Sequence, residues 1–200
     1  MENYDIVALG ELLIDFTCQS ADADGYPTMA AHPGGAPANF LAAAAHFGGR
    51  TAMLGKVGAD TFGRLLTGTL QKAGIDTQGI IMDENVFTTL AFVTLDAHGD
   101  REFSFARRPG ADTQLRFEEL PLSLLDNTRA LHFGTLSLTD EPARAATCCA
   151  VAYAKAHGKL ITFDPNLRRP LWRDPAEARE QIEGAHTIAI DVSDHVAVER

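Results

Sequence analysis

The sequence has few cysteines, few basic residues and no long apolar run, and each shortage excludes a class of protein. Three cysteines (Cys18, Cys148 and Cys149) are an odd count without metal-ligand spacing, which argues against a disulfide framework and favours a reducing compartment. The 17 basic residues stand against 27 acidic ones, and the formal net charge of −10 argues against a nucleic-acid partner. No apolar stretch approaches the roughly 20 residues of a membrane span. The acidic N-terminus shows no signal-peptide pattern, so we expect a cytoplasmic protein without a membrane partner.

Several common active-site motifs are also missing. The sequence contains no G-x-x-x-x-G-K-[ST] phosphate-binding loop, no G-x-G-x-x-G after the first apolar run and no G-x-S-x-G nucleophile turn. The seven histidines form no H-x-x-x-H or H-E-x-x-H pair, so no zinc site is expected and no metal ligand is assigned. These absences exclude P-loop proteins and disfavour dinucleotide-binding enzymes of the usual kind.

A glycine turn followed by an alanine-rich helix, at residues 32–49, is the most distinctive stretch of the chain. Gly34 and Gly35 lack a Cβ atom, so the backbone there can bend tightly and approach a ligand closely. Pro37 suits the first helical turn, where its missing N–H is not needed. Asn39 lies in the same turn, beside free N–H groups that can hold a polar or anionic ligand. The alternative is a well-capped structural helix.

Short apolar runs alternate with helical patterns along most of the chain. Strands are expected at 6–10, 51–55, 80–82, 129–134, 159–164 and 187–190. Helices are expected between them, including 60–73, 141–157 and 176–184. The order predicts an α/β fold, a doubly wound, mostly parallel sheet with helices on both faces. Residues 20–33, which are rich in Ala, Asp, Gly and Pro, are expected to be loop.

The pattern changes at residues 88–107, where two strand-like segments flank a glycine-containing loop at 96–100. We expect a small β lid that can pair with an extended segment at 12–17. Alternation places Phe103, Phe105 and Arg107 on one face of the second strand. For Arg107, a surface position in which the aliphatic stem covers apolar area is an equal alternative.

The expected lid implies both the domain boundaries and an interface between subunits. We expect residues 1–11, 34–86 and 109–200 to form the α/β core and residues 12–33 and 87–108 to form the lid. Both faces of the strand at 88–95 are apolar, and a ribbon with two apolar faces is rarely stable alone. We therefore expect the complete protein to form a homodimer through the lid.

Three further polar residues stand out as ligand candidates. Asp15 interrupts an apolar stretch, where a carboxylate is either a turn or cap residue or a ligand group. Asn166 and Arg168 follow the strand expected at 159–164, at its carboxyl end, where open α/β sheets bind ligands. A Pro-rich turn held by hydrogen bonds is the alternative for these two.

Six sequence blocks, in order, carry a resemblance to a known family. The blocks are 10–16 (GELLIDF), 33–39 (PGGAPAN), 55–63 (GKVGADTFG), 101–112 (REFSFARRPGAD), 132–138 (HFGTLSL) and 164–168 (DPNLR). Together they resemble the PfkB (ribokinase-like) carbohydrate kinases, and bacterial fructokinases most. The glycine pair alone would be a weak signal, but six blocks across nearly the whole chain are specific.

The resemblance implies ATP-dependent transfer of a γ-phosphoryl group to a hydroxyl of a ketose such as fructose, with Mg²⁺ as cofactor. It implies that the sugar is bound by Asp15, Gly34, Gly35, Asn39, Phe103, Phe105 and Arg107. It implies that Asn166 and Arg168 lie near the transferred phosphoryl group, where arginine suits phosphate oxygens. A closed lid would also exclude water and limit ATP hydrolysis.

Two departures from the family pattern bear on activity. Val196 stands where the family has a glutamate, and Asp191 stands where fructokinases often have lysine. The family's C-terminal third, with its G-A-G-D run, catalytic base and anion hole, is absent, so we expect part of the sheet to be missing and this chain to be inactive alone. A 2-keto-3-deoxygluconate kinase or another PfkB sugar kinase is one alternative. A non-catalytic sugar-binding remnant of a truncated gene is another.

Overall fold

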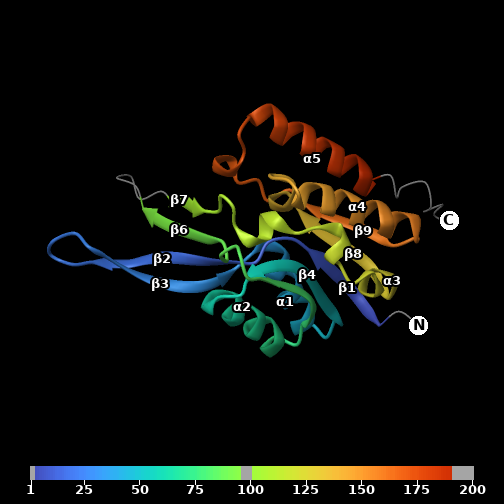
Figure 1. Cartoon of the computed structure of the whole chain (residues 1–200), viewed down its shortest axis with the longest axis horizontal. Coiled ribbons are helices and arrows are strands. Elements are labelled where there is room, and N and C mark those ends of the chain that lie inside the picture. Colours follow the sequence, from blue (N-terminus) through green and yellow to red (C-terminus); the bar gives the residue numbers. More distant parts are fainter. Residues whose placement is uncertain (1–2, 96–100, 191–200) are drawn as a thin grey trace.

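The computed structural model describes residues 3–95 and 101–190, which form a layered α/β core and a β lid that projects from one end of it (Figure 1). The core sheet has the order β5-β4-β1-β8-β9, and all its neighbouring strands run parallel. Its strands are β1 (Tyr4–Leu9), β4 (Thr51–Gly58), β5 (Asp76–Asp83), β8 (Thr128–Gly134) and β9 (Leu160–Asp164). Every residue of β4 is buried, as expected for a central strand covered on both faces.

Helices cover both faces of the core sheet (Figure 1). On one face lie α1 (Ala36–His46) and α2 (Thr61–Lys72), packed on a cluster that includes Ala8, Leu41 and Met53. The other face carries a larger cluster, with Val7 and Leu9, beneath α3 (Leu122–Asp126), α4 (Ala143–Ala156) and α5 (Pro175–Ile190). Single-turn helices lie at η1 (Ala111–Gln114), η2 (Phe117–Glu119), η3 (Leu136–Leu138) and η4 (Arg169–Leu171). The predicted fold class is confirmed.

The lid is a second, four-stranded sheet with the order β3-β2-β6-β7. Its strands are β2 (Leu13–Ala21), β3 (Pro27–Gly34), β6 (Leu90–Leu95) and β7 (Arg101–Ala106). β6 and β7 form the predicted antiparallel hairpin, and β6 pairs in parallel with residues 14–17 of β2. The predicted pairing of this hairpin with residues 12–17 is therefore confirmed.

The carboxylate of Asp60 links the start of the lid hairpin to a helix of the core. Asp60 caps α2, because its Oδ1 accepts hydrogen bonds from the N–H groups of Phe62 and Gly63, each at 2.8 Å. Its Oδ2 accepts a third hydrogen bond from the N–H of Thr88, also at 2.8 Å, just before β6 begins. The start of the lid hairpin is thus fixed to a helix end.

Two local predictions are wrong. Most of residues 20–33 is strand, because β3 pairs with β2 along nearly its whole length and this pairing outweighs weak local propensity. The turn between them is held by Asp22, whose Oδ1 accepts hydrogen bonds from the N–H groups of Asp24 and Tyr26. Residues 187–190 continue α5 instead of forming a strand, because a short apolar run suits either structure. Residues 191–200, which include the off-pattern Asp191 and Val196, lie outside the described part of the chain.

None of the described helices has the length and apolar character that a bilayer crossing requires.

Candidate functional site

A hollow of about 120 Å³ lies where the first turn of α1, the lid and the segment after β9 meet. It is lined by Glu11, Leu13, Asp15, Gly35, Ala36, Asn39, Phe103, Phe105, Leu136, Asn166 and Arg168. Seven of the nine residues predicted for the site are in this set, although they come from four separate stretches of sequence. The structure therefore brings most of the predicted residues together.

Asp15 lies on β2 with its carboxylate half-buried beside the glycine turn. Burial raises the pKa of Asp15, against the attraction of Arg168 and His32. Gly34 pairs with Leu13 across β2 and β3, and a Cβ atom at Gly34 would collide with Oδ2 of Asp15. Gly34 therefore does not line the hollow itself but leaves room for the carboxylate that does.

Gly35 is the residue through which β3 turns into α1. Its φ is 121°, in the region that favours glycine, and a Cβ atom there would collide with the backbone oxygen of Glu11. The backbone N–H of Ala36 points to the Oε1 of Glu11 at 2.8 Å. Asn39 is exposed on the first turn of the helix, so its amide is accessible from the hollow.

We expect Gly35→Ala to lower the free energy of unfolding by about 1–3 kcal/mol, because it combines a strained φ with a collision against backbone. Gly25→Ala is the matched control: Gly25 also has a positive φ, of 87°, but a Cβ atom added there would meet no other atom within 4 Å. Urea denaturation of both variants would measure the difference. A Gly35 variant no less stable than the Gly25 variant would contradict the collision.

The lid and the segment after β9 meet above the hollow. Phe103 and Phe105 stack on one face of β7, with ring centroids 6.3 Å apart, as alternation predicted. The guanidinium carbon of Arg168 lies 5.8 Å from the centroid of Phe103, within range of a cation–π interaction. Asn166 adopts a φ of 32°, and its N–H donates to Oδ1 of Asp164 at 3.1 Å, which turns the chain toward the lid.

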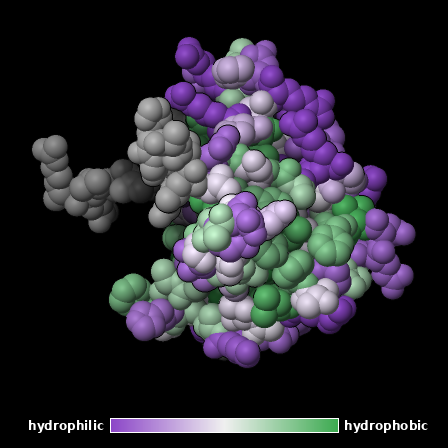
Figure 2. Space-filling model, turned by 90° about the vertical axis from the view of Figure 1, so that its left-hand side faces the viewer, coloured by the Kyte–Doolittle hydropathy of each residue, from purple (hydrophilic) through white to green (hydrophobic). Residues whose placement is uncertain are grey.

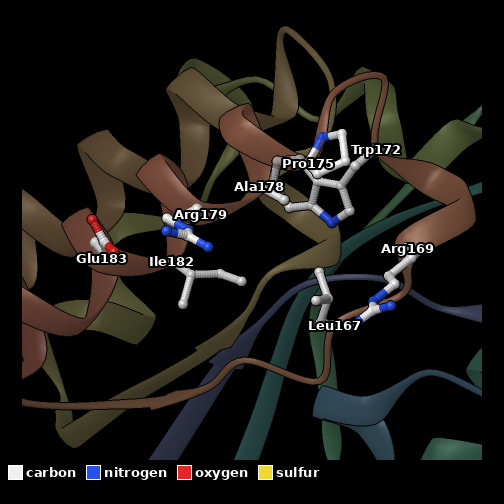
Figure 3. Close-up of a pocket in the computed structure, with 8 residues that line it drawn as sticks. All are labelled: Leu167, Arg169, Trp172, Pro175, Ala178, Arg179, Ile182 and Glu183. Atoms are coloured by element: carbon white, nitrogen blue, oxygen red, sulfur yellow. The ribbon is translucent and has the colours of Figure 1, made fainter.

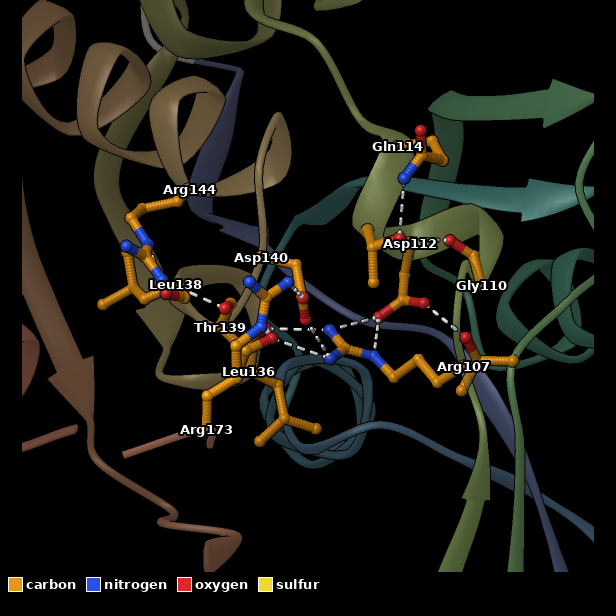
Figure 4. Close-up of polar contacts among 12 residues, drawn as sticks. Arg107, Gly110, Asp112, Gln114, Leu136, Leu138, Thr139, Asp140, Arg144 and Arg173 are labelled. Carbon is orange, nitrogen blue, oxygen red and sulfur yellow. Dashed lines mark hydrogen bonds and ion pairs between the residues drawn. The ribbon is translucent and has the colours of Figure 1, made fainter. Parts of the chain in front are cut away.

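Arg107, in contrast, does not line this hollow. Its polar contacts are drawn in Figure 4. Its guanidinium is buried and contacts the carboxylate of Asp112 through two nitrogens, each at 2.8 Å. It also donates to Oγ1 of Thr139 at 2.7 Å and to the backbone oxygen of Leu136 at 2.8 Å. The expectation that Arg107 contacts the sugar does not fit this position. The alternation that placed it beside Phe103 stops where β7 ends, at Ala106.

The residue that sequence reasoning missed is Glu11. It stands in one of the family-like blocks, yet the sequence pattern alone gave it no role. It is only 2 % exposed and lines the hollow, and burial raises its pKa to about 7. The available signal was an acidic residue next to an apolar strand, the same signal that singled out Asp15.

A second hollow, of about 550 Å³, lies between η4 and α5 (Figure 3). The side chains of Trp172, Pro175 and Ala178 gather at one end of it, with Ile182 at the other. Its lining is mostly apolar and contains none of the nine residues predicted for the site. The smaller hollow is therefore the candidate site, because it collects polar groups from several elements.

Within residues 3–95 and 101–190, no three His, Cys, Asp or Glu side chains lie close enough together to hold a metal ion. A phosphate group fits the hollow better, since Arg168 supplies a cation and Asn166 an amide at its rim.

A parallel, doubly wound sheet with a β lid that lines a polar hollow is the architecture of the ribokinase-like carbohydrate kinases. The chain belongs to the pfkB family of carbohydrate kinases, whose sequence profile matches residues 3–193.

Known relatives agree with this assignment. The chain is 49% identical over 179 residues to a probable fructokinase-3 from Arabidopsis thaliana, in an alignment that covers 88% of this chain and 52% of the relative. It is 46% identical over 193 residues to fructokinase-2 from Solanum habrochaites, covering 94% and 59%. The chain thus spans little more than half the length of these relatives.

Solved structures show the same fold. A fructokinase from Xylella fastidiosa superposes with a TM-score of 0.89 at 34% identity, covering 94% of this chain and 58% of that one. A fructokinase from Vibrio cholerae O395, with fructose, ADP and calcium ion bound, gives a TM-score of 0.79 at 34% identity, covering 94% and 59%.

Proposed function

We propose that this chain supplies the sugar-binding portion of an ATP-dependent ketose kinase, with fructose as the substrate. The observation that carries the proposal is the hollow itself, in which Asp15, the turn at Gly35 and Arg168 converge. A carboxylate suits sugar hydroxyls as a hydrogen-bond acceptor, and a guanidinium suits phosphate oxygens. The fructokinases among the relatives support the choice of sugar.

In this proposal the residues of the hollow position the sugar and neutralise charge. Asp15 accepts hydrogen bonds from sugar hydroxyls, and Asn39 approaches the sugar from the first turn of α1. Arg168 and Asn166 face the phosphoryl group, which ATP supplies with Mg²⁺. Phosphoryl transfer depends mostly on such positioning and charge stabilisation. The stacked aromatic rings of the lid cover the sugar and exclude water, which limits wasteful hydrolysis of ATP.

The nearest alternative substrate is 2-keto-3-deoxygluconate, because Arg168 could also pair with a sugar carboxylate. Residues 109–112 do not line the hollow and therefore do not bear on the choice between the two sugars. Asp112 is instead buried against Arg107. The preference for fructose therefore depends on the lid residues Phe103 and Phe105 and on the relatives.

Calorimetric titration of the chain with fructose and, separately, with 2-keto-3-deoxygluconate tests the proposal, and ADP release with ATP and Mg²⁺ tests turnover. We expect saturable fructose binding, with ADP release absent from this chain alone. Preferential binding of 2-keto-3-deoxygluconate would replace the substrate, and binding of neither sugar would overturn the proposal. Sugar-dependent ADP release would show that the chain contains a catalytic base that we do not assign.

We further propose that the lid, residues 12–33 and 87–108, forms a homodimer. Seen from the lid end, apolar residues gather across the middle of the face (Figure 2). Phe16 and Phe92 stack at 5.4 Å and are only partly buried, and Tyr26 at the tip is 71% exposed. Light scattering is expected to give twice the chain mass of 21.5 kDa. A monomer at micromolar concentration would contradict this interface.

A cytoplasmic location is part of the same proposal. All three cysteines are exposed and free, which suits a reducing compartment.

A further inference from the structure

One carboxyl oxygen in the hollow is buried without a partner. Glu11 follows β1, and its Oε1 accepts the hydrogen bond from the N–H of Ala36, at the start of α1. Its Oε2 is fully shielded from solvent and makes no hydrogen bond within the described ranges. Glu11 therefore differs from the other buried carboxyl group nearby, since both oxygens of Asp112 have partners in Thr89 and Arg107.

Such an oxygen is costly to leave unpaired, because burial removes the water that would otherwise hydrogen-bond it. The bond from Ala36 fixes the orientation of the carboxyl group, so the second oxygen is already positioned before any ligand arrives. The residue lines the same hollow as Asp15 and Asn39. A ligand with several hydroxyl groups can satisfy the free oxygen there, whereas an apolar ligand cannot.

We propose that Glu11 is a specificity-determining residue of the hollow, whose free carboxyl oxygen hydrogen-bonds a sugar oxygen while Asp15 accepts a hydrogen bond from a different hydroxyl. The inference rests on the proposed sugar binding and deepens it. Glu11 would thus be a second hydrogen-bonding residue for the sugar, next to the start of α1. Sugars that lack the matching oxygen would leave Glu11 unpaired and bind less tightly.

The protonation state decides which way this hydrogen bond runs. Burial raises the pKa of Glu11 to about 7, against the backbone N–H groups of Ala36 and of Glu11 itself, while Asp112 adds to the rise and Arg107 opposes it. Across the hollow the other charged groups are Asp15 and Arg168. Below pH 7 the carboxyl group carries its proton and donates, which complements the acceptor Asp15. Above pH 7 it loses the donor, so sugar affinity falls as pH rises through this value.

The test is calorimetric titration of the chain with fructose, from about pH 5.5 to about pH 8.5, for the wild type, Glu11→Gln and Glu11→Leu. Glu11→Gln keeps an acceptor for the Ala36 N–H and replaces the proton donor with an amide that does not titrate. It is expected to bind fructose at every pH as the wild type does below pH 7. Glu11→Leu is expected to bind about three- to tenfold more weakly, which is the loss of one hydrogen bond. Glu118→Gln, at an exposed position, is the matched control.

The outcomes separate this inference from the proposed function. A wild type that binds no sugar overturns both. Wild-type binding with an unchanged Glu11→Leu affinity overturns only the role of Glu11. Where Glu11→Leu fails to fold, judged by its circular dichroism, the Glu11→Gln pH profile decides. A wild-type pH dependence that persists in Glu11→Gln assigns the titration to another group and overturns the inference.

Discussion

Replacing Arg107 with methionine is expected to lower the free energy of unfolding by about 3–5 kcal/mol. The side chains of Arg107 and Asp112 are each 2 % exposed, so the variant would leave Asp112 charged, buried and without its cation. The hydrogen bonds to Thr139 and Leu136 would be lost with it. The loss comes mainly from the group left behind, since burying an unpaired carboxylate is far more costly than removing both partners.

The adjacent residue provides the control for this experiment. Arg108 is exposed, so Arg108→Met is expected to change stability by less than about 0.5 kcal/mol. Arg107→Lys is expected to be nearly as unstable as Arg107→Met, because a single ammonium group cannot contact Asp112, Thr139 and Leu136 together. Urea denaturation monitored by circular dichroism measures all three variants. Equal stability of Arg107→Met and Arg108→Met would show that the buried network contributes nothing.

Asp15→Ala is expected to weaken fructose binding by about 1.5–3 kcal/mol, which is about 10- to 150-fold. Asp15 contributes a charged acceptor to the hollow, and its raised pKa shows that burial already opposes its charge in the free protein. Removing it should therefore leave stability unchanged or slightly higher. An affinity loss without a stability loss identifies a binding group and not a structural one.

Calorimetry with fructose measures the affinity of this variant, and thermal unfolding measures its stability. Asp24→Ala is the matched control, because Asp24 is exposed on the turn between β2 and β3. Unchanged fructose affinity in Asp15→Ala would remove Asp15 from the site.

The sequence was sufficient to locate most of the candidate site because its residues lie at the ends of recognisable elements. Asp15 interrupts an apolar run, Gly35 precedes a helix, and Arg168 follows a strand, so local pattern made them candidates, and the resemblance to the PfkB kinases assigned them to the site. Arg107 could not be placed in this way, because its position depends on Asp112 and Asp140, 5 and 33 residues away. Glu11 carried the same local signal as Asp15, but its contact with the N–H of Ala36, 25 residues away, is not specified by any local pattern.

The order of apolar runs and helical patterns was enough to predict the fold, but it did not predict the structure of two segments. β3 exists because β2 lies beside it, and a pairing of this kind is invisible in a run of Ala, Asp, Gly and Pro. Residues 187–190 contain β-branched residues that suit a strand, yet they extend α5. Short apolar runs at the end of a helix remain ambiguous until their neighbours are known.

The direct junction between β3 and α1 has a mechanical consequence. β3 ends at Gly34 and α1 begins at Ala36, so a single residue joins an edge strand of the lid to the helix whose first turn lines the hollow. Because only Gly35 separates the two elements, a change in the angle of β3 is expected to change the orientation of the first turn of α1. A ligand that contacts Ala36 and Asn39 is therefore expected to restrict the lid, and a partner bound to the lid is expected to restrict the first turn of α1.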